Sequence, residues 1–495
     1  PRLRSLVLQA LGEHGGILTA SRLPSAEAGA LPLHRQEWRA ALERLRLGTT
    51  GVISLRDFGI DLEEEGLLIF QELILQNALD RVRGEAPECD REVSLGVDLL
   101  VDLERILEIV HMEQVEVTRE GTLFKKTEER IGPKLITPGC AEVFNGEAVQ
   151  FLFGLCRRLN FFDLDGARLR CDQIRRRAWA VKRPLAKIRE IFALLQLESR
   201  SVRWSFHQVA LRELFTASLT ALPPGKWVEA RALFAAAVAS YLLSLKQRGV
   251  DAEFRRRANE DFHHEKLMAP LEKLHHDLSY WVLHRLALLG LVDLGYRKKS
   301  LEALRLSPLG AQFFSLQAAA SSPLGSPEGR MASPSAEGAA KMIVNPDFEV
   351  LLFPGDERQA ELTLTLSHFA DCVASERVKR YQVNAESVKR GVIGGMEVGA
   401  ILGFLDANSS GPLPPNVRYS IREWGEGVEP IQRQWVLLLR ARSKAGAERL
   451  QALLEAHEVP CERFGDSGLL VQAARGERVL RELREALRDQ GLYLE

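Results

Sequence analysis

The sequence predicts a multi-domain protein that is mainly α-helical with short β-hairpins and that ends in an α+β region. Its 495 residues exceed the length at which a single hydrophobic core keeps growing, so several domains are expected. Hydrophobic residues make up 46% of the chain and charged residues 27%, as in ordinary folded proteins. The third observation is a recurring order of apolar-periodic helix and hairpin signal, which is typical of winged helices. Four such units are expected, over 1–92, 93–140, 141–204 and 205–316.

The first unit, over 1–92, contains two helix patterns followed by a hairpin. Apolar residues recur with helical spacing in Ser5–Gly12 and again in Gln36–Leu47. Strand formers then occupy Val52–Leu55, and the returning strand is expected around Leu67–Ile69. Two helices and then a wing is the order expected of a winged helix.

The next two units repeat this order in shorter form. Residues 93–140 hold a helix over Leu99–Val110 and a hairpin over Val115–Lys126 that turns at Glu120-Gly121. Residues 141–204 hold a helix over Val149–Leu159, which precedes two short strands. Those strands join at an Asp-Gly dipeptide, Asp165-Gly166, which is a strong hairpin signal between apolar residues.

The fourth unit, over 205–316, places its hairpin close to a low-complexity segment. A helix is expected over Trp281–Leu288, a strand over Leu291–Leu294 and its return over Leu304–Leu306. Downstream, residues 315–340 contain mostly Ala, Ser, Pro and Gly. Such a composition buries too little apolar surface to offset its ordering entropy, so a flexible linker is expected over 317–341.

Basic residues gather at two places where a winged helix touches a duplex. The densest run surrounds an aromatic side chain. Arginines contact phosphates and an exposed ring stacks on a base, so this run is the leading candidate for DNA contact. A second cluster falls at the expected wing tip, between Tyr296 and Ser300. The alternative is a solvated surface that binds no ligand. The candidate residues are Arg168, Arg170, Arg175, Arg176, Arg177, Trp179, Lys182, Arg183, Arg297, Lys298 and Lys299.

Motifs for catalysis, metal binding or membrane insertion are missing from the sequence. Gly225-Lys226-Trp227 lacks the leading glycine and the Ser/Thr of a phosphate-binding loop, and we find no DEAH box or nucleophile elbow. The pairs His263-His264 and His275-His276 lack zinc-ligand spacing, which favours surface or packing roles. The six cysteines are scattered, and no apolar run has the length of a membrane span. We therefore expect a cytoplasmic protein without enzymatic activity, catalytic residues, metal or cofactor.

The α+β region, over 342–430, begins with a strand expected over Val344–Phe353. A helix is expected to start near Ala385, and the glycines between Gly391 and Gly399 favour a tight turn between two helices. Beyond it, 431–495 has the βαββα pattern of a ferredoxin-like domain, with strands at 435–439 and 468–471 and helices at 445–456 and 479–487. That fold hosts many functions.

Three phrases in this region occur in a fixed order: Ile343–Phe348, Tyr381–Asn384, and Leu413–Val417 ahead of Trp424. In this order they resemble the accessory domain that precedes the motor of XPB-type DNA helicases, which also occurs in bacterial helicase-associated proteins without a motor. The resemblance covers about a sixth of the chain. It implies a role beside a helicase in DNA metabolism.

Two functions follow from the sequence. One is a non-catalytic DNA-binding adaptor that positions DNA and a helicase or nuclease partner in repair, processing or defence. The other is a scaffold subunit whose winged helices bind protein. The net charge of -1 means that any DNA contact comes from local patches, because the whole molecule has no cationic field.

Overall fold

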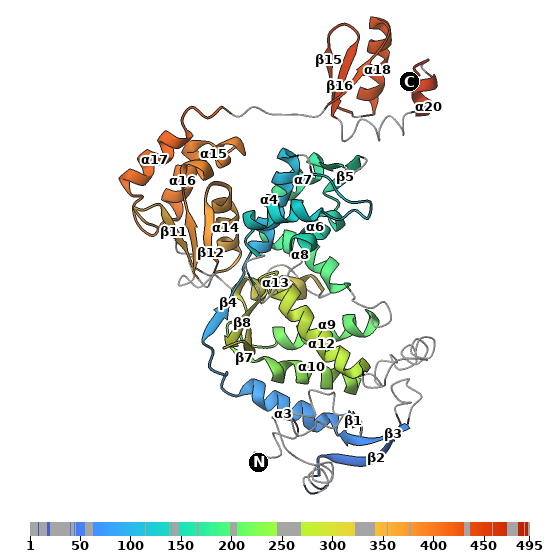
Figure 1. Cartoon of the computed structure of the whole chain (residues 1–495), viewed down its shortest axis with the longest axis vertical. Helices are drawn as coiled ribbons and strands as arrows, with labels where there is room; N and C mark the ends of the chain where they lie inside the picture. The colour runs from blue at the N-terminus through green and yellow to red at the C-terminus, as the bar shows by residue number, and fades with distance from the viewer. Residues whose placement is uncertain are drawn as a thin grey trace.

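The computed structural model describes most of the chain as helices joined to small antiparallel sheets (Figure 1). The described residues are 46–54, 63–137, 148–198, 205–244, 269–321, 342–429, 436–472 and 484–493, with gaps at 114, 166–167, 354, 376–377, 458 and 490, together with 8, 17–19, 40, 44 and 140. The expectation of a mixed fold of helices and short antiparallel strands is confirmed at this level.

The N-terminal sheet has the strand order β1-β3-β2. The expected hairpin is present, since β2 (Gly48–Ser54) pairs antiparallel with β3 (Glu63–Ile69). Strand β1 (Ile17–Thr19) adds to the other side of β3. The helices expected over 5–12 and 36–47 fall almost entirely outside the described residues.

The second and third expected units pack against each other. Most of the helices expected from periodicity are present, and the Asp165-Gly166 hairpin pairs Phe162 with Cys171. The hairpin expected over 115–126 is reduced to one bridge between Val117 and Leu123. The amide of Leu169 donates to the carbonyl of Val115 at 2.9 Å, so the two hairpins are joined edge to edge. The elements are α4 (Asp98–Met112), α5 (Lys125–Ile131), α6 (Ala148–Arg158), β5 (Phe162–Asp165), β6 (Arg168–Cys171), α7 (Gln173–Ala180) and α8 (Pro184–Gln196).

Within 205–306, the elements that the structure describes, which leave out 245–268, follow the order helix, strand, helix, helix, strand, strand. The last two strands form a hairpin, and β4 and β7 flank it in the order β4-β8-β9-β7. The helix expected over 281–288 begins earlier and continues past Trp281 as a π-helical turn over Val282–Leu286. The elements are β4 (Arg91–Val93), α9 (Ser205–Thr220), β7 (Val228–Glu229), α10 (Ala230–Ser244), α12 (Ala269–Trp281), β8 (Val292–Arg297) and β9 (Ser300–Leu306).

Helix α10 is buried almost all round, as expected of a helix without a polar face. Its small side chains allow a close approach to α3 (Gln71–Arg83), where Ala78 packs against Ala235 and Ala236. At the end of the hairpin, the hydroxyl of Ser307 accepts from the amide of Gly310 at 2.9 Å. Helix α13 (Pro308–Ser321) begins there and runs four residues beyond the expected start of the linker. Residues 322–341 lie outside the described residues.

The region from 342 to 425 is a four-stranded antiparallel sheet in the order β10-β11-β13-β12 with helices around it. The single strand expected over 344–353 is instead a hairpin, because the amide of Asn345 donates to the carbonyl of Glu349 at 2.8 Å and closes a turn. The helix start near Ala385 and the turn between α15 and α16 are confirmed. The elements are β10 (Met342–Val344), β11 (Glu349–Leu352), α14 (Glu357–Phe369), β12 (Asp371–Ser375), β13 (Lys379–Gln382), α15 (Ala385–Ile393), α16 (Val398–Asn408) and α17 (Pro415–Gly425).

The C-terminal unit has one three-stranded sheet in the order β14-β16-β15. Both strands expected from the sequence lie where predicted, and so does the helix between them. Helix α18 covers one face of the sheet through Leu450 and Leu454. The elements are β14 (Val436–Arg440), α18 (Lys444–Ala456), β15 (Cys461–Phe464), β16 (Gly468–Gln472) and α20 (Arg484–Asp489).

The 342–425 region packs against α4 of the N-terminal half. Lys379 forms an ion pair with Asp98 at the first position of α4, and its ammonium also donates to the carbonyl of Leu95 at 2.8 Å. The hydroxyl of Ser375 donates to the same carboxylate. Both charges are buried, so this contact is part of a packed interface rather than a surface ion pair.

Candidate nucleic-acid interface

The first candidate surface is α7, with the hairpin before it and the turn after it. Asp172 caps the helix, and its carboxylate accepts from the amides of Ile174 and Arg175. This cap starts the helix immediately before Arg175, Arg176 and Arg177, which occupy consecutive positions of its first turns. The local sequence thus places the three arginines on one short helix.

Trp179 does not occupy the surface. Only 1% of its side chain is exposed, and its ring packs edge-on against Phe161 with the ring centroids 5.2 Å apart. Stacking on a base requires an exposed aromatic face. The predicted stacking role is therefore wrong, and the reason is helical periodicity, which turns position 179 toward the core while its neighbours Ala178 and Ala180 face solvent.

Several of the predicted cations are already paired with acidic residues. Arg175 and Lys182 share the carboxylate of Glu190, the former at 3.1 Å. Arg168 lies 3.5 Å from Glu116, and both of these side chains are more than half exposed. Such pairs lower the local positive potential, but the side chains remain in contact with solvent. An exposed pair contributes little to stability.

Three other cations of this surface have no ion-pair partner among the described residues. Arg177 and Arg183 are exposed, and Arg176 is partly so. Arg170 is half-buried in β6. Two exposed apolar side chains, Ile174 and Val181, lie beside these arginines. The sequence analysis overlooked them, because single exposed apolar residues leave no periodic signal.

The second candidate surface is the turn between β8 and β9. Arg297, Lys298 and Lys299 are exposed there, and no described residue forms an ion pair with any of them. Lys298 has a positive φ of 59°, which tightens the turn. Its amide donates to the carboxylate of Asp90 at 2.9 Å, so this tip is held against the strand that precedes α4. The predicted cationic tip is therefore solvent-accessible and anchored.

On α12, His275 packs in the interior, whereas His276 is exposed. His275 lies edge-on to Phe234 with the ring centroids 5.9 Å apart, and Asp277 accepts from Gln208. His263 and His264 lie outside the described residues. Within the part of the chain that the structure describes, no group of three or more metal-ligating side chains converges. Nor is any helix in that part long and apolar enough to cross a bilayer.

One part of the chain matches a known family model. Residues 342–458 match the family model described as the helicase conserved C-terminal domain. This segment is therefore similar to a domain of helicases. It includes the four-stranded sheet and its helices and extends through β14 and α18 of the C-terminal unit. None of the curated proteins compared with the chain matches its sequence.

Proposed function

We propose that this protein is a helicase-associated adaptor that binds DNA through its N-terminal half and docks a helicase or nuclease through its C-terminal half. The observation that carries the proposal is the exposed Arg297-Lys298-Lys299 turn between β8 and β9. The elements of residues 205–306 follow the order of a winged helix, and this turn is then the wing tip. Arg176, Arg177 and Arg183 provide a second set of phosphate contacts.

The similarity of 342–458 to a helicase domain supports the choice of nucleic acid as ligand. The phrases that resemble the XPB-type accessory domain form β10, β13 and the start of α17, which are structural elements of this same segment. The adaptor is non-catalytic in this proposal, because the sequence contains no phosphate-binding loop.

The proposal is tested with purified protein and fluorescent duplex and single-stranded DNA of unrelated sequences. We expect binding at low salt with little sequence preference and no ATP hydrolysis with or without DNA. Failure to bind either DNA at low salt would overturn the DNA-binding role. ATP turnover that is lost on a point mutation in this chain would overturn the non-catalytic role.

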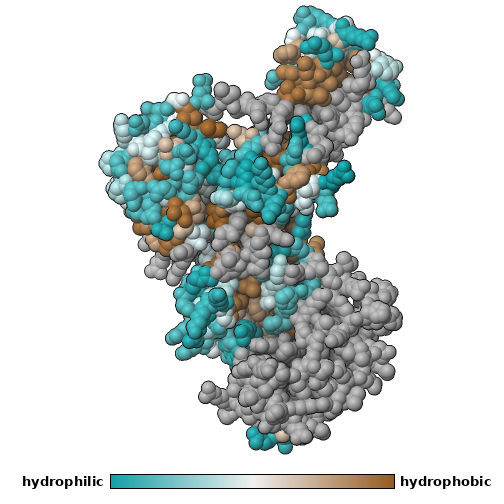
Figure 2. All heavy atoms as spheres, in the orientation of Figure 1, coloured by the Kyte–Doolittle hydropathy of each residue, from teal (hydrophilic) through white to brown (hydrophobic). Residues whose placement is uncertain are grey.

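A scaffold function is the second candidate, and the C-terminal sheet supports it. Val436, Leu438 and Phe464 share the sheet face opposite α18 and are each more than 40% exposed. Figure 2 shows an extensive apolar area on this unit, whereas hydrophilic residues cover most of the visible face of the 342–425 region. Contiguous exposed apolar residues mark protein-binding surfaces. DNA binding that fails at low salt would favour this function.

A further inference from the structure

The face of the C-terminal sheet opposite α18 is open to solvent and largely apolar. Side chains alternate along a strand, so Val436 and Leu438 on β14 point to the same face. The strand register brings Leu470 of β16 and Phe464 of β15 to this face as well. Phe464 is 55% exposed, and Val436 and Leu438 are each 41% exposed. A contiguous exposed patch of this kind indicates a binding surface.

Two charged residues lie on this face, one on each side of the apolar patch. Glu462 on β15 lies across β16 from Leu438. Arg440 lies two residues further along β14, across β16 from Phe464. The apolar line from Val436 through Leu438 to Phe464 therefore runs diagonally between the two charges. Both charged side chains are exposed, and no described residue forms an ion pair with either.

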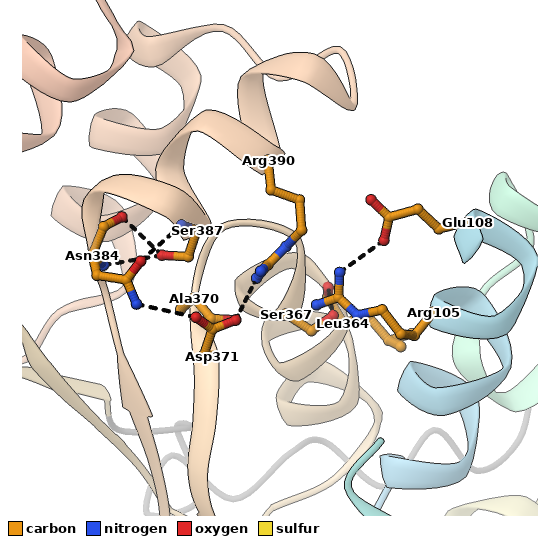
Figure 3. Close-up of polar contacts among 9 residues, drawn as sticks. All are labelled: Arg105, Glu108, Leu364, Ser367, Ala370, Asp371, Asn384, Ser387 and Arg390. Carbon is orange, nitrogen blue, oxygen red and sulfur yellow. Dashed lines mark hydrogen bonds and ion pairs between the residues drawn. The ribbon is translucent and has the colours of Figure 1, made fainter. Parts of the chain in front are cut away.

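The charges at the boundary between α4 and the 342–425 region differ, because they are paired within the chain. Arg390 pairs with Asp371 at 2.8 Å, and Arg105 pairs with Glu108 at 2.8 Å. Figure 3 shows both pairs, with Arg390 on α15 and Arg105 on α4. These four side chains need no second molecule, whereas the two charges of the C-terminal face are available to one.

We propose that the open face of the C-terminal sheet binds the same face of a second copy of the chain. A face with a cation on one side of an apolar line and an anion on the other is complementary to itself. When two copies meet face to face about a two-fold axis along this line, Arg440 of each copy meets Glu462 of the other. The apolar side chains then pack between the two ion pairs.

The balance of charge on this face argues against DNA as its ligand. One cation and one anion give no net positive potential to attract phosphates. The inference therefore does not rest on the DNA-binding role. It names the partner of the apolar face that supports the scaffold function.

The size of the face predicts a weak dimer. Three strands about 4.8 Å apart and five residues of about 3.3 Å each give a surface of roughly 15 by 17 Å. This is smaller than a standard protein interface, which buries about 800 Å² on each partner. A dissociation constant in about the micromolar range is therefore expected.

Sedimentation velocity of the full chain between about 1 and 100 μM tests for the dimer. We expect a concentration-dependent shift from monomer to dimer. Leu438→Asp places a carboxylate in the middle of the apolar line and should raise the dissociation constant at least about tenfold. The matched control is Val373→Asp, because Val373 is 61% exposed and lies on β12 of another sheet. An equal loss of dimer in the control would overturn the inference.

Charge reversal tests which residues face each other. Arg440→Glu and Glu462→Arg each place like charges opposite one another, so each variant alone should dimerise about tenfold more weakly. An equal mixture of the two variants restores opposite charges at both contacts. With one variant fluorescently labelled, the mixture should form a heterodimer of nearly wild-type affinity. Mixing cannot rescue a folding defect, so this recovery is specific to the proposed contact.

Three results would overturn the inference. The first is a chain that stays monomeric up to about 100 μM, which leaves DNA binding and the binding of another protein by this face open. The second is a dimer that Leu438→Asp leaves unchanged, because the contact then lies elsewhere. The third is a mixture of the charge variants that dimerises no better than either alone. If Leu438→Asp instead abolishes DNA binding while the dimer persists, the face belongs to the DNA interface.

Discussion

Lys379 and Asp98 form a buried ion pair between two parts of the chain that are 281 residues apart in sequence. The carboxylate is 0% exposed and the lysine side chain 7% exposed. Asp98 opens α4, where the helix dipole favours a negative charge, and Lys379 opens β13 of the 342–425 region. The pair therefore couples the position of that region to the core of the N-terminal half.

Removing one partner of this pair is expected to be strongly destabilising. Lys379→Met leaves the Asp98 carboxylate buried without its cation, which costs about 3–5 kcal/mol. The double variant Asp98→Asn, Lys379→Met removes both charges and is expected to recover part of that loss. Urea titration followed by circular dichroism measures the free energy of unfolding of the single and the double variant.

The matched control is Lys389→Met, because Lys389 is an exposed lysine in the same region. A change within about 0.5 kcal/mol is expected there. If Lys379→Met unfolds at the same urea concentration as the control, the buried pair does not hold the interface.

Asp102 is expected to make stability depend on pH. Burial raises its pKa to about 7, so the folded protein binds a proton that the unfolded chain releases near pH 4. The folded state therefore holds more protons between about pH 4 and 7, and the free energy of unfolding falls as pH rises through this window. Above pH 7 this contribution stays constant. Asp102→Asn is expected to flatten the dependence in urea titrations at pH 5, 6, 7 and 8. If the free energy of unfolding of Asp102→Asn depends on pH as steeply as that of the wild type, the dependence comes from another group.

Neutralising the β8–β9 turn is expected to weaken DNA binding for all sequences alike. Arg297→Ala, Lys298→Ala and Lys299→Ala together remove up to three phosphate contacts. The slope of log affinity against log salt should fall by up to about three, because each contact releases roughly one counterion. Fluorescence anisotropy across a salt series measures the slope.

The control has the same composition, with Lys125, Lys126 and Arg130 on α5 changed to Ala. These side chains are exposed but lie outside both candidate surfaces. An unaltered slope in the turn variant, or an equal drop in the α5 control, would contradict a specific role for the turn.

The arginines of α7 are expected to contribute less than their number suggests. Arg175 is paired with Glu190, so changing Arg175, Arg176 and Arg177 together to Ala should reduce the salt slope by about two rather than three. The salt slopes of the single variants Arg175→Ala and Arg177→Ala separate the contribution of the paired arginine from that of the unpaired one. The prediction fails if Arg175→Ala reduces the slope as much as Arg177→Ala does.

Trp179→Ala is expected to act on stability rather than on base stacking. Because the indole is buried against Phe161, its removal should cost about 3–5 kcal/mol of unfolding free energy. Single-stranded and duplex DNA should then lose affinity equally, in proportion to the unfolded fraction. A selective loss of single-stranded binding by a fully folded variant would restore the stacking role.

Features that depend on neighbouring residues can be recognised from the sequence alone. Asn384 and Ser387 form a capping box at the start of α15, since each side chain accepts from the other's amide. The pairing of β5 with β6 flanks the Asp165-Gly166 dipeptide that predicts a hairpin here. Both signals lie within a few residues of the structure they specify, so no distant contact is needed to recognise them.

Which side chains of a local pattern reach solvent depends on how the helices pack. Trp179 and Arg177 lie two residues apart in the same basic run, yet one is in the core and the other in solvent. Arg175 is partly neutralised because α8 brings Glu190 beside it. Such differences depend on how α7 packs against Phe161 and α8, which composition does not show.

The interface between the two halves could not be predicted from the sequence either. Asp98, Lys379 and Arg390 belong to no motif, and their spacing along the chain carries no periodicity. They acquire meaning only when chain folding brings α4 against β13 and α15, because burial then makes each charge require a partner and each donor require an acceptor.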